Sequence, residues 1–322
     1  MRTLLTMVLT MCLGSAGWVM AQDAEPAEGA SFLMPTAAMP PVVAKVGDVE
    51  IKSFEVERVL LSAPPNQMAP RGEVVKMLVS RELIRHFLKA NKIAVTNEEM
   101  KPKLAEIEAV AKKCDLTVEQ VMLMKHITMD DVRDQIAIEK LIKQRVDDRV
   151  DEFIAKNPAA FNGTTVKASH ILIKVDPTES TADQLAAKKQ LEAVRADIRA
   201  GKITFADAAK KFSQDGSANN GGELGEFMFN DMVFPFSQMA FATKVNEVSP
   251  IVQSLYGFHI ILVTARTEGK EEIRADLARD QARRMLMSQL ETDIFTQPAN
   301  GVTVEIFFKE PEMPVFMQGM PE

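Results

Sequence analysis

The order of apolar and polar positions divides the chain into a helical first part, a mixed middle part and a short helical end. Residues 42–46 and 49–51 are rich in Val and Ile and flank Gly47-Asp48, which predicts two short strands around a turn. Between residues 74 and 88, apolar side chains recur every three or four positions, as they do on one face of an α-helix. The first ordered elements are therefore expected to be a hairpin and a long helix.

Three later helices are predicted from their start signals, each a threonine followed three residues later by an acid or an amide. The pairs are Thr96 with Glu99, Thr117 with Gln120, and Thr128 with Asp131. In each pair the hydroxyl can accept a hydrogen bond from an early backbone N–H, while the later side chain reaches back to the threonine. The last of these helices is expected to continue to about Ala155 and to end at Asn157-Pro158, because proline interrupts a helix.

At Val166 the pattern changes from helical to strand-like. Residues 166–175 form an apolar run typical of a buried strand, and residues 181–200 form an amphipathic helix closed by Gly201. A short helix, a glycine-rich loop, a helix rich in Met and Phe, and two strands follow up to residue 263. This order of elements predicts a compact α+β module.

After Arg266 the pattern is helical again. A charged helix is expected from about Glu271 to Phe295, and residues 302–306 alternate as a half-buried strand does. This strand and the one at residues 42–46 are each too short to be stable alone. We therefore expect them to meet, so that the N- and C-terminal segments form one mainly helical domain into which the middle module is inserted.

Both ends of the chain differ in composition from the rest. Residues 1–21 combine a basic start, an apolar run and a small-residue cleavage pattern, which is typical of a secretory signal peptide. A membrane anchor is the alternative, but the apolar run is short and is interrupted by Thr, Gly and Ser. Residues 22–41, rich in Ala, Pro, Glu and Met, predict a flexible spacer. We expect a periplasmic or otherwise exported protein with no stable membrane insertion after cleavage.

Charge and cysteine content exclude several kinds of partner and chemistry. The formal net charge is −7, and loss of Arg2 with the signal peptide would leave 37 basic against 45 acidic residues, or −8. Nucleic acids and anionic membranes need a basic face, so neither is expected as the main partner. Cys114 would be the only cysteine of the mature chain, which leaves no intrachain disulfide.

Four stretches of the middle module carry candidate chemistry. Two contain a histidine within an apolar strand, His170 and His259, and a third places Asp215 just after a helix. The fourth is Gly221-Gly222-Glu223-Leu224-Gly225, whose glycines allow a tight turn. Alone, a histidine in an apolar strand is more often a core residue than a site residue. Zinc is a further alternative for two histidines and an Asp, but the spacing of zinc motifs is missing from the sequence, so neither a metal nor a cofactor is expected.

In their order and spacing the four stretches resemble the parvulin, or rotamase, family of peptidyl-prolyl cis/trans isomerases. The resemblance runs from Val166 to Arg266, and the family pattern fits without a gap from Asp215 to His259. It implies a four-stranded antiparallel sheet with flanking helices. It also implies isomerisation of X–Pro peptide bonds with no cofactor.

The resemblance further implies roles for individual residues. The catalytic candidates are His170, Asp215, His259 and Ser254, and the substrate-binding candidates are Leu224, Met232, Phe236 and Tyr256. The histidines would lie side by side on central strands, and Leu224, Met232 and Phe236 would form an apolar pocket for the proline ring. Asp215 stands where other members have Cys or Asp. Val233 departs from the family pattern, which often has Gln there, and this puts in doubt how the substrate backbone is held.

The physical chemistry of the reaction agrees with such a site. Rotation about an amide bond faces a barrier of about 18–20 kcal/mol, so uncatalysed X–Pro isomerisation is slow. The twisted transition state is less polar than the planar amide, and a dry apolar pocket with a few polar groups would therefore favour it. Asp215 in the position of Cys argues against obligatory attack by a thiol.

These expectations combine into a domain plan and two candidate functions. The plan is a signal peptide (1–21), a spacer (22–41), a helical chaperone-like domain (42–160), a parvulin domain (165–266), a C-terminal helix and strand that pack on the N-terminal domain (267–308), and a tail (309–322). The helical segments resemble the N-terminal domains of exported foldases of the SurA and PrsA families. The first function is isomerisation of X–Pro bonds in unfolded or partly folded exported polypeptides. The second is a holdase whose parvulin domain binds peptides with little or no isomerisation, and a homodimer is left open for both.

Overall fold

The computed structural model describes residues 38–62, 69–124, 127–296 and 301–309. The predicted signal peptide, most of the predicted spacer and the tail from residue 310 lie outside these ranges. The chain divides into two compact units: one comprises Met1–Glu82, Val95–Ile136 and Thr303–Glu322, and the other comprises Leu83–Ala94 and Ala137–Val302. In the described ranges, every helix is too short or too polar to cross a membrane.

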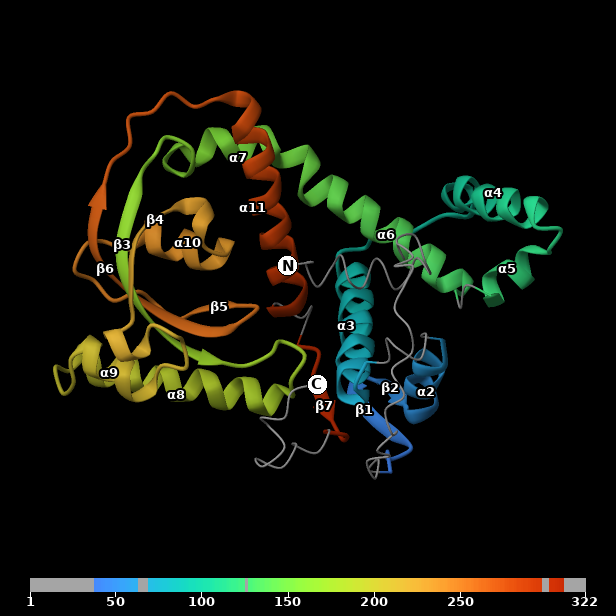
Figure 1. The fold of residues 1–322 in the computed structure, drawn as a ribbon, viewed down its shortest axis with the longest axis horizontal. Helices are drawn as coiled ribbons and strands as arrows, with labels where there is room; N and C mark the ends of the chain where they lie inside the picture. The colour runs from blue at the N-terminus through green and yellow to red at the C-terminus, as the bar shows by residue number, and fades with distance from the viewer. Residues whose placement is uncertain (1–37, 63–68, 125–126, 297–300, 310–322) are drawn as a thin grey trace, which may run out of the picture. The chain divides into compact units, whose positions relative to one another are not determined.

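The first unit contains a sheet that joins the two ends of the described chain. Its strand order is β2 (Val49–Lys52), β1 (Val42–Val46), β7 (Val304–Ile306), with antiparallel pairing throughout (Figure 1). The backbone N–H groups of Phe307 and Phe308 both donate to the carbonyl oxygen of Val43. The predicted meeting of the N- and C-terminal strands is confirmed by this pairing.

The helix start signals are confirmed as well. Helices α4 (Asn97–Lys113), α5 (Val118–Met124) and α6 (Met129–Arg145) follow directly on the three capping threonines. Each threonine hydroxyl accepts from the backbone N–H three residues later, and the side chain at that position accepts from the threonine N–H. The predicted long helix is α3 (Arg71–Ala90), whereas α2 (Ser53–Ser62) had no counterpart in the sequence-based prediction.

One predicted helix is shorter than expected. α6 ends at Arg145, and after Val146 (φ −120°, ψ −72°) the chain continues through a 3₁₀ turn (Asp147–Arg149) into α7 (Val150–Lys156). The prediction of one continuous helix to about Ala155 is therefore wrong. Val146 and Val150 are both buried, so helical apolar spacing persists across the break and conceals it in the sequence.

The second unit is built around a four-stranded antiparallel sheet. Its strand order is β4 (Glu223–Met228), β3 (Thr165–Lys174), β6 (Gly257–Thr267), β5 (Val252–Ser254) (Figure 1). Helices α8 (Thr181–Arg199) and α9 (Phe205–Phe212) cover one face, and α10 (Phe234–Ala242) covers the other. This confirms the predicted α+β fold class and its four-stranded antiparallel sheet with flanking helices.

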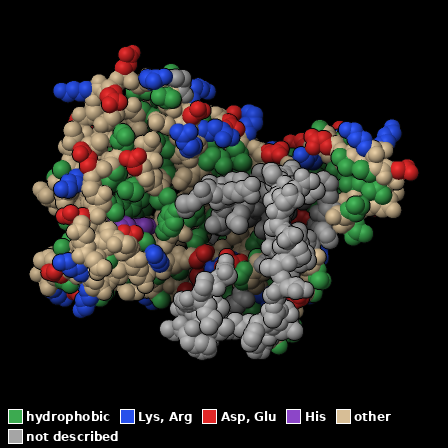
Figure 2. All heavy atoms as spheres, in the orientation of Figure 1, with side chains coloured by type: hydrophobic (Ala, Val, Ile, Leu, Met, Phe, Trp, Pro, Cys, Tyr) green, Lys and Arg blue, Asp and Glu red, His purple; other side chains and the backbone are tan. Residues whose placement is uncertain are grey.

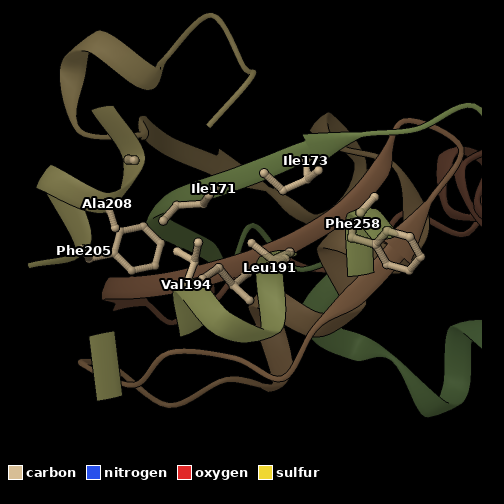
Figure 3. Packing of buried hydrophobic residues seen from close by; sticks show 10 residues of the cluster. Ile171, Ile173, Leu191, Val194, Phe205, Ala208 and Phe258 are labelled. Carbon is tan, nitrogen blue, oxygen red and sulfur yellow. The ribbon is translucent and has the colours of Figure 1, made fainter. Parts of the chain in front are cut away.

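Strand alternation separates two apolar cores. Ile171 and Ile173 of β3 pack against α8 and α9 through Leu191, Val194 and Phe205 (Figure 3). Successive strand residues point to opposite faces of a sheet. The side chain of His170 therefore lies on the face covered by α10.

Helix α11 (Ala275–Thr296) contacts α7, and it also contacts α10 and β5. Arg283 Nε donates to Asp147 Oδ1 at 2.8 Å, and Arg279 pairs with Asp151, so two ion pairs connect α11 to the segment at α7. The sequence-based plan had this helix packing on the N-terminal segments. Its contact with α10 was not predicted, because the apolar stripe of a helix does not name its partner.

The segments that enter and leave the sheet are hydrogen-bonded to each other. Gly269 N–H donates to Thr164 Oγ1 at 3.0 Å, and Glu271 N–H donates to the carbonyl oxygen of Asn162 at 3.0 Å. The adjoining strand residues Thr165 and Thr267 lie opposite each other on β3 and β6. We call this crossing point, residues 162–165 and 267–271, the neck of the module.

Candidate functional site

The second unit brings the four catalytic candidates together. His170 lies on β3, His259 on β6, Ser254 at the end of β5, and Asp215 in the loop after α9. His170 is opposite Ile261 while His259 is opposite Leu172, so the two histidines are diagonal neighbours on adjacent strands. Their rings stack with centroids 5.7 Å apart and an interplanar angle of 20°. In Figure 2, histidine atoms reach the surface beside hydrophobic and acidic side chains.

A row of close polar contacts, called the polar row below, joins these four residues. Ser254 Oγ is 2.8 Å from His259 Nε2, and His259 Nδ1 is 3.5 Å from His170 Nδ1. His170 Nε2 is 3.0 Å from Asp215 Oδ1, a close contact that lacks regular hydrogen-bond alignment. The histidines and Ser254 are buried, whereas the Asp215 side chain is 31% exposed, so the row runs from the core to the surface.

Two ionisable members of the row, Asp215 and His259, have pKa values shifted in ways that fix their charge. Partial burial opposes ionisation of Asp215, but hydrogen bonds from the hydroxyl and N–H of Ser217, together with His170, hold the pKa of this carboxyl well below its usual range. Burial lowers the pKa of His259 to about 3, with a further lowering from His170 and an opposing effect of Asp215. At neutral pH the row therefore contains an ionised Asp215 and a neutral His259.

These charge states allow the protons of the row to be assigned. An ionised carboxylate only accepts hydrogen bonds, so His170 Nε2 carries the proton that faces Asp215. The Nδ1 atoms of His170 and His259 lie 3.5 Å apart, so one of them donates and the other accepts; with one proton on His170, held at Nε2, the donor is His259 Nδ1. His259 Nε2 is left to accept from the hydroxyl of Ser254, whose oxygen itself accepts from Tyr256 N–H at 3.0 Å. In this set of tautomers, each member of the row donates its proton to the next member in the direction of Asp215.

An apolar wall lies against the row. Phe236 of α10 stands edge-on to both histidine rings, with centroid distances of 5.5 Å to each. The buried Phe227 of β4 packs on Phe236, and Leu224 and Met232 are half-buried members of the same cluster. The three predicted pocket residues therefore share one apolar cluster beside the polar row.

Tyr256 is connected to the row mainly through its backbone. It occupies the turn between β5 and β6, its N–H donates to Ser254 Oγ, and 47% of its surface is exposed. The aromatic ring thus lies at the surface next to the buried end of the row.

A glycine allows the loop before β4 to approach the histidine strand closely. Gly222 has φ +78°, and its carbonyl oxygen accepts from His170 N–H at 2.9 Å. A Cβ atom at this position would lie 2.2 Å from the carbonyl oxygen of His170. Any larger residue would therefore have to displace the backbone of His170.

Three positioning contacts were not singled out from the sequence. Ser213 Oγ accepts from Leu172 N–H, and Gln214 N–H donates to the Leu172 carbonyl oxygen, which holds the segment before Asp215 along β3. Ser217 donates both its N–H and its hydroxyl to Asp215. The Asp-Gly-Ser spacing is typical of a turn closed by an Asp side chain and could have indicated the last contact.

The described residues contain no group of three or more His, Cys, Asp or Glu side chains arranged to hold a metal ion. At the site itself, an ionised carboxylate and a chain of close polar contacts lie against an apolar cluster.

Comparisons with known proteins match this region and, in one relative, about two thirds of the chain. The family model for rotamases, described as a PPIC-type PPIase domain, matches residues 170–265. The foldase protein PrsA of Geobacillus kaustophilus is 33% identical over 229 residues, which cover 67% of this chain and 73% of that protein. The chaperone SurA of Bordetella parapertussis is 38% identical over 126 residues, 39% of this chain but only 23% of SurA.

Two similar solved structures differ in how much of this chain they match. The crystal structure of PrsA from Bacillus anthracis is matched over 68% of this chain and 90% of that chain, with 21% identity and a TM-score of 0.33. The solution structure of TbPIN1 is matched over 31% of this chain and 97% of that chain, with 36% identity and a TM-score of 0.28.

Proposed function

Because the chain belongs to the PrsA foldase family and carries a PPIC-type peptidyl-prolyl isomerase domain, we propose that it isomerises X–Pro bonds in unfolded exported polypeptides. The family match confirms the resemblance to parvulins that the sequence indicated. The protein is a peptidyl-prolyl cis/trans isomerase that assists protein folding. The finer part of the proposal is the role of each site residue in the isomerisation.

The observation that carries the assignment is the polar row lying against the apolar cluster. We assign the proline ring to the wall formed by Leu224, Met232 and Phe236, whose side chains share one apolar cluster. The carbonyl oxygen of a planar amide carries more negative charge than that of the twisted amide. An ionised Asp215 near this oxygen raises the energy of both planar states more than that of the twisted state, which lowers the barrier.

The remaining members of the row support Asp215. Ser254, His259 and His170 form a buried chain of contacts whose orientation directs a proton of His170 toward the carboxylate. This chain keeps the carboxylate in place while the amide twists. No proton needs to be transferred and no covalent bond needs to form in this scheme.

A proline-peptide isomerisation assay on the chain from residue 22 onward tests the proposal. We expect the rate to exceed that in buffer and to fall strongly on Asp215→Ala. A rate no higher than that in buffer, measured on a protein that still suppresses aggregation of an unfolded client, would rule out the enzyme assignment.

Holdase activity is the second candidate, and exposed apolar side chains of the first unit favour it. Phe54 and Leu61 on α2 are 60% and 85% exposed, and Leu123 and Met124 on α5 are 75% and 68% exposed. Apolar, Met-containing surfaces suit adaptable binding of varied apolar segments. An aggregation-suppression assay with Leu123→Ser and Met124→Ser separates the two candidates, because this double change should weaken holdase activity and leave peptide isomerisation intact.

We further propose that residues 1–21 are removed during export and that residues 42–160, 165–266 and 267–308 are the functional segments of the mature chain. The composition of the first 21 residues supports the cleavage. Mass spectrometry of the secreted protein would give the mature N-terminus, and an intact Met1 would contradict the proposal. Light scattering on the same material would decide between monomer and homodimer.

A further inference from the structure

The hydrogen bonds to Asp215 are concentrated on one of its two oxygens. Ser217 donates its N–H (2.9 Å) and its hydroxyl (2.6 Å) to Oδ1, and His170 Nε2 lies 3.0 Å from the same atom. Among the described residues, every hydrogen bond to this carboxylate ends on Oδ1. With the side chain 31% exposed, Oδ2 is the oxygen left for another group.

The turn that Ser217 closes has a close counterpart elsewhere in the same unit. Asp176 Oδ1 accepts from Thr178 N–H at 2.9 Å and from Thr178 Oγ1 at 2.6 Å. The donors and distances are the same, so both hydroxyls contribute to folding a local turn in the same way. At Asp215, however, the accepting oxygen also meets a histidine of the polar row. A role for Ser217 beyond turn formation must therefore appear as a difference between these two turns.

We propose that Ser217 is a positioning residue for the isomerisation, which holds Asp215 Oδ1 toward His170 and thereby leaves Oδ2 to face the substrate. The inference rests on the proposed function of the site. Two donors from one residue restrict rotation of the carboxylate about its Cβ–Cγ bond. They also favour its ionised form, because a hydrogen bond to a charged group stabilises that charge.

The effect of Ser217 extends along the row. With one proton on His170, an ionised Asp215 favours that proton on Nε2, and the proton between the two Nδ1 atoms then belongs to His259. Without the hydroxyl, the carboxylate keeps the backbone N–H of residue 217 and the contact with His170, and it rotates more freely about its Cβ–Cγ bond. The histidine protons are then ordered less strictly by their acceptor.

Kinetics of matched variants test the proposal. Ser217→Ala and Thr178→Val each remove one hydroxyl from one of the two turns. Loss of one hydrogen bond of ordinary strength predicts a fall of roughly three- to tenfold in kcat/KM for Ser217→Ala, mainly through kcat. Thr178→Val should leave kcat/KM unchanged, and Ser217→Thr, which keeps a hydroxyl, should restore most of the activity. Equal losses in Ser217→Ala and Ser217→Thr would overturn the proposal.

A double-mutant cycle tests whether Ser217 acts through Asp215. In an Asp215→Ala background, Ser217→Ala should cause no additional loss, because the group it positions is gone. A further threefold or larger loss in that background would show that Ser217 works by another route and would overturn the proposal.

Histidine tautomers give a test that does not depend on activity. The chain has 4 histidines, so long-range ¹⁵N NMR of the imidazole rings is practicable. We expect the wild type to show His170 protonated on Nε2 and His259 on Nδ1, and Ser217→Ala to move both rings toward tautomer averages, while Thr178→Val does not. Unchanged tautomers in Ser217→Ala overturn the positioning role. If the spectra behave as expected but the wild type is inactive, the proposed function fails and the inferred effect of Ser217 on the row stands.

Discussion

Replacing Gly222 by Ala should destabilise the isomerase module and reduce its activity together. Gly222 has φ +78°, a conformation that costs an L-residue about 1–2 kcal/mol. The added Cβ would also lie 2.2 Å from the His170 carbonyl oxygen, so the loop or β3 must move. Movement weakens the hydrogen bond from His170 N–H to Gly222 O, with a net loss of about 0.5–1.5 kcal/mol. The free energy of unfolding should therefore fall by about 2–3 kcal/mol or more.

Gly225→Ala is the matched control, because Gly225 has φ +77° in the same strand region but no atom within 4 Å of an added Cβ. Its free energy of unfolding should fall only by the cost of the positive φ for an L-residue, about 1–2 kcal/mol, and its activity should be kept. Urea unfolding of the chain from residue 22, followed through the fluorescence of Tyr256, measures both variants, since the sequence has a single Tyr and its only Trp is Trp18. If both variants lose equal stability and equal activity, the close approach of Gly222 to His170 has no energetic role and the reasoning is wrong.

Three other predictions concern the polar row and its surroundings. The pKa of His259 is about 3 in the folded protein and about 6.5 when unfolded, so the unfolded state binds the extra proton between these values. The free energy of unfolding should fall as the pH drops from about 6.5 toward 3, by up to about 1.4 kcal/mol per unit, and urea titrations at several pH values should lose this slope in His259→Asn. Asp215→Ala and His170→Ala should each lower isomerisation about tenfold or more in a peptide assay, while Phe212→Tyr, at the core on the opposite face of the sheet, should not; equal losses in all three would count against the site. Saturating proline-containing peptide should change the fluorescence of Tyr256, and an unchanged signal would contradict its place beside the site.

Much of the fold could be predicted because its signals are local. Each of the threonines before α4, α5 and α6 makes its hydrogen bonds within three residues, so the sequence alone contains both partners. The break at Val146 was missed for the opposite reason. A buried valine fits a continuous helix as well as an interrupted one, and only packing with distant residues decides between the two.

The candidate site also combines features with local signals and features that depend on distant residues. His170 and His259 are 89 residues apart, and no local pattern reveals that their ring nitrogens lie 3.5 Å from each other. Their proximity depends on the register between β3 and β6, in which a shift by one residue would turn one histidine to the opposite face. The resemblance to a family indicated the pair, whereas for Ser217 the sequence offered only the Asp-Gly-Ser turn spacing, and its contacts with Asp215 come from the structure.

The neck has a consequence for how such a chain arises and how it can be divided. Because Thr165 and Thr267 are paired, the chain enters and leaves the module about one strand spacing, roughly 4.8 Å, apart. A segment with adjacent ends can be inserted into a host gene, deleted from it or exchanged for a relative while the path of the flanking chain is kept. The hydrogen bonds at Thr164 and Asn162 hold the two ends of that segment together. A direct junction between residues 162 and 269 would keep the path of the flanking chain. It would also remove α10 and β5, which contact α11, so α11 would lose part of its packing partners.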